Sequence, residues 1–121
     1  MMGSVTSVHT QWSTVFNTKN GSVFQSDKEN CWYIDFAGEV KKFDYRCLLK
    51  LKNAVYQIDI NQLLLSQSKN ADLEIISVCA CAHCYVLSFL EIIALKELLQ
   101  GTFVMLELNH IIHDRLYRIV A

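Results

Sequence analysis

The chain has 121 residues, of which 52% are hydrophobic and 19% charged, and its formal net charge is −1. This length suits one domain with one core, and the near-neutral charge gives no basic field that would attract nucleic acid or an anionic membrane. Glu91, Lys96 and Glu97 interrupt the most apolar segment, so no stretch reaches the length of a membrane span. The N-terminus lacks the basic and apolar regions of a signal peptide. We therefore expect a cytoplasmic protein whose five cysteines are reduced thiols.

The first part of the chain predicts a flexible N-terminus over residues 1–11, followed by a single domain over residues 12–121. Asn20-Gly21 separates two alternating segments, which is a strong hairpin signal. The aromatic segment Cys31–Phe36 and the segment Glu39–Phe43 flank an Ala37-Gly38 turn. Together these segments predict a four-stranded antiparallel meander.

An amphipathic helix is expected next, with Asp44 as its N-cap. Apolar residues recur behind it at helical spacing, at Leu48, Leu51, Val55 and Ile58. Asp59 is a candidate cap for a further short turn through Leu65, and residues 66–70 (SQSKN) are typical of a loop.

Two more strands, LEIISVCA and HCYVLSF, are expected on either side of a reversal at Cys81-Ala82. The spacing then becomes helical from Leu90, and Gly101 is placed as a residue that ends the first of two C-terminal helices. Thr102 is the expected cap of the second helix, which continues to Ile119. Strands, a helix, a further hairpin and two helices predict an α+β domain.

The segment CACAHCY, from Cys79 to Tyr85, contains three of the five cysteines. It carries one C-x₂-C pair of the kind that zinc sites use, so Cys79, Cys81, His83 and Cys84 are the candidate metal ligands, completed by Cys31 or by a second subunit. A second short-spaced pair is missing from the sequence. Redox chemistry, including a Cys79–Cys84 disulfide if the two residues lie opposite each other, is another interpretation. The interpretation that we favour is core packing, because cysteine is often buried as a small hydrophobic residue.

Two polar segments also contain candidate functional residues. Glu107 and His110 have the i, i+3 spacing of di-iron carboxylate bundles, with His113 and Asp114 beside them, but the motif occurs once where such bundles need it twice. A solvated helix face is favoured, and a dimer that brings two copies together would reopen the metal interpretation. The basic segment Lys41–Lys52 is read as the solvent face of a helix and a protected strand end, so nucleic-acid binding is disfavoured.

The stretches NGSVFQSDKENCWYIDFAGEVKKFDYRCLLKLK and HCYVLSFLEIIALKELLQGTFVMLELN resemble small bacterial proteins built on domains of unknown function. The shared features are the Asn20-Gly21 turn, the Phe36-Ala37-Gly38 turn and Leu87-Ser88, within a similarity that covers roughly Trp12 to Ile119. The resemblance implies a compact α+β unit and carries over no activity and no catalytic residues.

No catalytic motif occurs in the sequence: there is no Gly-rich phosphate loop, nucleophile elbow or HExxH. The mean hydropathy of +0.21 is high for so short a chain, and a dimer interface would cover the excess apolar surface. We therefore expect a non-catalytic interaction or regulatory module that forms a homodimer through its C-terminal helices, with no cofactor and no catalytic residues. The alternatives are a zinc protein that uses the cysteine cluster, and a small-ligand binder or enzyme with a pocket near His110 and His113.

Overall fold

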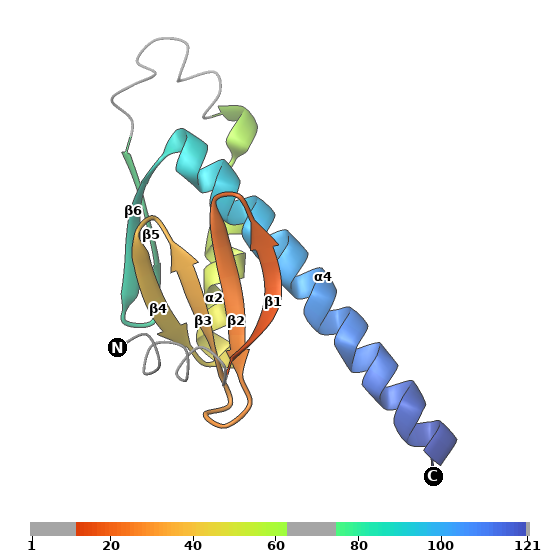
Figure 1. Ribbon diagram of the computed structural model, residues 1–121. Helices are drawn as coiled ribbons and strands as arrows, with labels where there is room; N and C mark the ends of the chain where they lie inside the picture. Colours follow the sequence, from red (N-terminus) through yellow and green to blue (C-terminus); the bar gives the residue numbers. More distant parts are fainter. Residues whose placement is uncertain (1–11, 63–74, 121) are drawn as a thin grey trace.

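The computed structural model describes the backbone of residues 12–62 and 75–120, and the side chains of the last helix through Ile111 (Figure 1). The predictions for residues 1–11 and for the loop at 66–70 fall outside these described residues. The elements combine strands and helices in one α+β arrangement, as the sequence predicted.

Four strands form the predicted antiparallel meander in the order β1-β2-β3-β4. They span Trp12–Thr18, Gly21–Ser26, Cys31–Phe36 and Glu39–Phe43. The first hairpin turns at residues 19–20, and Gly21 belongs to the strand, where it pairs with both Thr18 and Phe36. A Cβ on Gly21 would lie 2.8 Å from the Asp35 carbonyl oxygen, so close strand approach is what requires glycine there.

The helix α2 (Tyr45–Tyr56) begins as predicted at Asp44, whose carboxylate accepts a hydrogen bond of 2.8 Å from the Cys47 amide. Its apolar residues Leu48, Leu51 and Val55 are fully buried. Asp59 caps the following helical turn by accepting a hydrogen bond from the Gln62 amide at 3.1 Å.

A second sheet is the hairpin of β5 (Ile75–Ala80) and β6 (His83–Ser88), which reverses at residues 81–82 as predicted. The inner face of the hairpin places Val78, Tyr85 and Leu87 in the core. The tip lies beside β4, because the His83 ring nitrogen Nε2 donates a 2.7 Å hydrogen bond to the carbonyl oxygen of Lys42.

One continuous helix, α4 (Phe89–Val120), replaces the two C-terminal helices that the sequence predicted. Its start is a capping box, in which the Ser88 amide donates to the Glu91 carboxylate at 2.9 Å and the Glu91 amide to the Ser88 hydroxyl at 3.3 Å. None of the helices in the described parts of the chain is long and apolar enough to cross a membrane.

The residues taken as a helix end and a helix start have other roles. Gly101 lies inside α4, where a Cβ would overlap the ring of Phe16 in β1. Thr102 is fully buried, and its hydroxyl donates to the Leu98 carbonyl oxygen at 2.7 Å, the bond that a threonine makes within a helix. The glycine at position 101 therefore allows α4 and β1 to pack in close contact.

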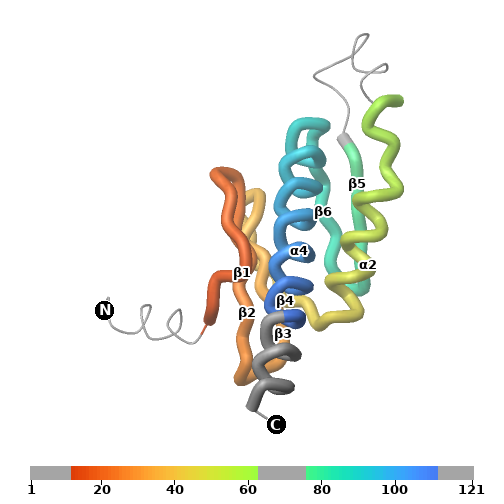
Figure 2. Tube along the Cα trace, turned by 90° about the vertical axis from the view of Figure 1, so that its right-hand side faces the viewer, coloured from red at the N-terminus to blue at the C-terminus, as the bar shows by residue number. Residues whose placement is uncertain are grey.

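The central helix joins the other elements. Figure 2 shows α4 between the four-stranded sheet on one side and α2 with the β5–β6 hairpin on the other, in agreement with its contacts to β1, β2, β5, β6 and α2. The side chains that fill this space from α4 are fully buried: Ile92, Leu95, Leu98, Leu99 and Thr102.

The contact between Gly101 and Phe16 can be tested by a double-mutant cycle. In the wild-type background, Gly101→Ala is expected to lower the free energy of unfolding by about 1–3 kcal/mol through overpacking. In a Phe16→Leu background the clash is relieved, and Gly101→Ala is expected to raise that free energy by up to about 1 kcal/mol through helix propensity. Urea denaturation followed by circular dichroism measures both free energies, and equal losses in the two backgrounds would show that contact with Phe16 is not what requires glycine at position 101.

Candidate functional site

The chemically reactive side chains gather at the tip of the β5–β6 hairpin. Cys79 and Cys84 lie directly opposite each other in the strand register and form a disulfide with a Cα–Cα distance of 4.0 Å. Both residues are exposed, on the face opposite to the buried Val78 and Tyr85. The alternation of strand side chains thus sends the cysteines outward and the large apolar groups inward.

A second disulfide joins the hairpin to α2. Cys81 bonds to Cys47, 34 residues earlier in the chain, with a Cα–Cα distance of 5.8 Å. Cys81 occupies the hairpin loop with a positive φ of 57°, a conformation that ordinarily favours glycine. Cys47 lies in the first turn of α2 and packs, half-buried, against the core.

The expectation of reduced thiols differs from this structure, which pairs four of the five cysteines. The fifth, Cys31, is free and buried in β3, where it packs as a small hydrophobic residue. The favoured interpretation of the cluster was that its own three cysteines pack in this way. That interpretation does not describe Cys79, Cys81 and Cys84, because all three are exposed.

The candidate metal ligands are close in sequence but are committed to separate partners. Cys79 bonds to Cys84, Cys81 bonds to Cys47, and His83 uses Nε2 to hold Lys42. Across residues 12–62 and 75–111, no three histidine, cysteine or acidic side chains form a group able to hold a metal ion. Zinc binding stays a prediction that concerns the reduced protein, in which His83 would have Nδ1 to offer.

Sequence reasoning missed Cys47 as a partner of the cluster. Its pairing depends on how α2 packs beside the hairpin, and no spacing rule carries that information.

A cavity of about 540 Å³ lies where α2, β3 and α4 meet, in the region in which a pocket near His110 was predicted. Its walls are partly aromatic and partly charged: Trp32, Tyr45, Leu49, Lys52, Phe103, Leu106, Glu107 and His110. Glu107 and His110 are both exposed on α4, whereas the side chains of His113 and Asp114 lie outside the described residues. The size is in the range of small-molecule sites.

The basic segment Lys41–Lys52 makes contacts within the protein. Lys41 lies 5.2 Å from the centre of the Tyr85 ring and pairs with Glu39 at 3.3 Å. Lys52 lies over the ring of Phe103 at 4.7 Å. These lysines cover aromatic surface with their charged ends.

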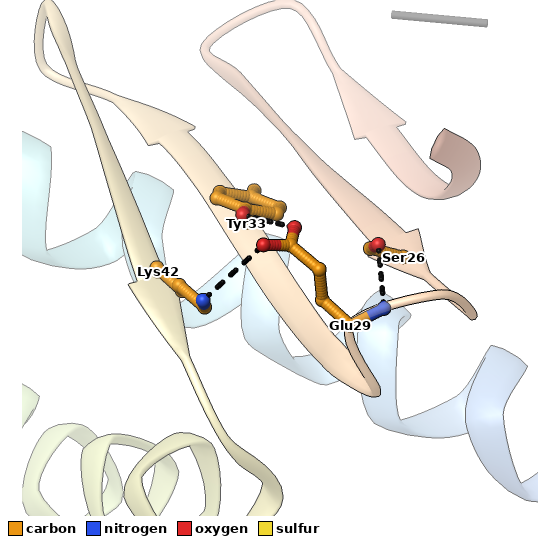
Figure 3. A network of polar contacts seen from close by, with 4 residues as sticks. All are labelled: Ser26, Glu29, Tyr33 and Lys42. Carbon is orange, nitrogen blue, oxygen red and sulfur yellow. Dashed lines mark hydrogen bonds and ion pairs between the residues drawn. The ribbon is translucent and has the colours of Figure 1, made fainter. Parts of the chain in front are cut away.

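A polar network crosses the outer face of the meander (Figure 3). The Tyr33 hydroxyl donates to the Glu29 carboxylate at 2.6 Å, Lys42 approaches the second carboxylate oxygen at 3.4 Å, and the Glu29 amide donates to Ser26 at 3.2 Å. The hydrogen bond from Tyr33 is the main cause that lowers the pKa of Glu29, with Lys42 adding to it. The same bond raises the pKa of Tyr33, because ionising the phenol beside a carboxylate is unfavourable.

Removing the Tyr33 hydroxyl should raise the pKa of Glu29 toward its ordinary value of 4.5. Because folding lowers this pKa, the network stabilises the fold above the unfolded-state pKa, and that contribution is lost as the pH falls through the folded-state value. NMR titration of the Glu29 carboxyl carbon in wild type and Tyr33→Phe measures the shift. Tyr45→Phe is the control that should leave the titration unchanged, and an unchanged titration in Tyr33→Phe would remove Tyr33 as the cause.

No family model, no curated protein and no solved structure matches the chain. This agrees with the resemblance to proteins built on domains of unknown function, from which no activity could be carried over.

Proposed function

We propose that the protein is a non-catalytic interaction module that forms a homodimer through the outer face of α4. The observation that carries this proposal is that α4 has apolar side chains on two opposite faces. One face packs into the core through Ile92, Leu95 and Leu99. The other is exposed, and an exposed apolar stripe along a helix is a surface that a partner ordinarily covers.

The outer face is set by the helical repeat. At about 100° per residue, Leu90, Val104, Leu108 and Ile111 fall on a common stripe, on the side of α4 away from its buried leucines, and the exposed Glu97 interrupts this stripe between Leu90 and Val104. Their exposed fractions are 74%, 65%, 45% and 42%. These are large apolar groups left in water in the described chain, and three of them are gathered within eight residues of one helix.

The helix also extends beyond the body of the domain. Figure 1 shows α4 continuing past the end of the four-stranded sheet toward the C-terminus. The whole of α4, from Phe89 to Val120, is about 48 Å long at the usual rise of an α-helix. A projecting helix of this length offers a partner access along its side.

A second copy of the chain is the occupant that we propose for this stripe. In a two-fold dimer the same patch serves both subunits, so one apolar stripe is enough to be complementary to itself. The high mean hydropathy of the chain, +0.21, is in keeping with surface that is covered in an assembly. Such a pairing removes the stripe from water on both subunits at once.

Small-ligand binding is the second candidate function, and the cavity of about 540 Å³ beside Trp32 and Phe103 is the observation that favours it. None of the four residues of the stripe lines this cavity, so ligand binding and dimer formation would use different residues. Zinc binding has no comparable support from the arrangement of the cysteines.

The homodimer is tested by replacing two residues of the stripe with charges. Light scattering at low micromolar concentration should give a dimer for wild type and a monomer for Leu108→Glu/Ile111→Glu, because two buried carboxylates per subunit would oppose association. The expected rise in the dimer dissociation constant is at least about 100-fold, equal to about 2.7 kcal/mol.

Val86→Glu and Val40→Glu are matched controls, since these valines are 66% and 55% exposed on strands and do not belong to the α4 stripe. Both controls should stay dimeric, and circular dichroism should show the same helix content in all variants. A monomeric wild type, or a double variant that still dimerises, would refute the proposal and leave ligand binding as the better candidate.

A further inference from the structure

We propose that Cys79–Cys84 is a thiol–disulfide exchange site that takes a dithiol reductant as its substrate, whereas Cys47–Cys81 is a structural crosslink. The inference is independent of the proposed dimer, because it concerns the outer face of the hairpin and uses no residue of α4. It rests on the placement of the four bonded cysteines.

Exposure separates the two disulfides. Both residues of the Cys79–Cys84 pair are exposed, and their neighbours on the same face, Ser77 and Val86, are exposed as well. A thiolate in solution can therefore reach either sulfur. In the second disulfide, Cys81 is exposed but Cys47 is half-buried against the core, which covers one side of that bond.

The surroundings of the exposed pair stay in place when its bond opens. Cys79 and Cys84 are held opposite each other by the strand ladder that runs from Ile75–Ser88 to Ala80–His83, and by burial of Val78 and Tyr85 beneath them. The hairpin tip is held separately by Cys81 and by the hydrogen bond from His83 to Lys42. The reduced form therefore keeps two thiols facing each other, ready to close again.

The long-range disulfide has the opposite character. It closes a loop between residues 34 apart, against five for the hairpin pair, so it restricts the unfolded chain more strongly. It also joins two separate elements, α2 and the hairpin, whose relative position it fixes. Opening this bond would remove a tie that the strand ladder cannot replace.

The exchange proceeds in two balanced steps. A thiolate of the reductant attacks the sulfur of Cys79 or Cys84, the protein S–S bond breaks, and the released cysteine sulfur takes up a proton. In the mixed disulfide, the second thiolate of the reductant then attacks the sulfur that belongs to the reductant. This forms the disulfide of the reductant and releases the second protein cysteine, which takes up a proton. Two electrons pass from the reductant to the protein, and an external disulfide reverses both steps.

Timed alkylation of the folded, full-length protein tests the assignment with dithiothreitol as the probe. After oxidised protein is exposed to the reductant, iodoacetamide and peptide mass spectrometry report each cysteine. Cys79 and Cys84 should be labelled together, at least about tenfold faster than Cys47 and Cys81. Free, buried Cys31 is an internal control that should remain unlabelled until the protein unfolds. In a parallel sample that is reduced but not alkylated, and from which dithiothreitol has been removed, oxidised glutathione should restore the hairpin disulfide without denaturant.

Two paired variants isolate the fast phase. Cys79→Ser/Cys84→Ser should lose it, and Cys47→Ser/Cys81→Ser should retain it. Equal opening rates for the two disulfides in wild type, labelling that appears only together with Cys31, or a fast phase that persists in Cys79→Ser/Cys84→Ser would each overturn the proposal. The wild-type experiment alone decides the question if a variant fails to fold.

Discussion

Burial of the inner face of α4 ties the separate parts of the molecule together. The four-stranded sheet and the β5–β6 hairpin are distinct sheets, and each presents an apolar face that needs a cover. The leucines and isoleucine of α4 fill the space between these faces and α2. Close approach to β1 at Phe16 then requires glycine at position 101, where a longer side chain would separate helix and sheet. The same helix is left with an outer stripe of exposed apolar residues.

Local signals predicted most of the architecture. The meander followed from alternating segments with Asn20-Gly21 and Ala37-Gly38 between them, and α2 followed from Asp44 and the spacing of its leucines. These signals concern neighbours in sequence, whose geometry depends little on the rest of the fold. The predicted position of the first hairpin turn was wrong by one residue. Glycine is needed at position 21 because the strand packs closely against β3 there, and not because of the turn.

The errors came from tertiary contacts. The pair Gly101-Thr102 is locally typical of one helix ending and another beginning. In the structure both residues lie inside α4: Gly101 allows the close approach of Phe16, and the buried hydroxyl of Thr102 donates to the Leu98 carbonyl oxygen. The cysteine cluster posed the same difficulty. Cys79 and Cys84 could be placed opposite each other only once the register was known, and Cys47 could be joined to Cys81 only once α2 had a position. The cavity beside Trp32 likewise collects side chains from three elements, and its aromatic wall had no sequence signature.

The bond between Cys47 and Cys81 has a consequence for the connectivity of the molecule. It turns the chain between these residues into a covalent ring that contains most of α2, all the residues up to β5, and β5 itself. A single break in the backbone anywhere in that ring would yield two fragments that remain one molecule. A cut between α2 and β5 would therefore leave α2 joined to the hairpin through the two sulfur atoms.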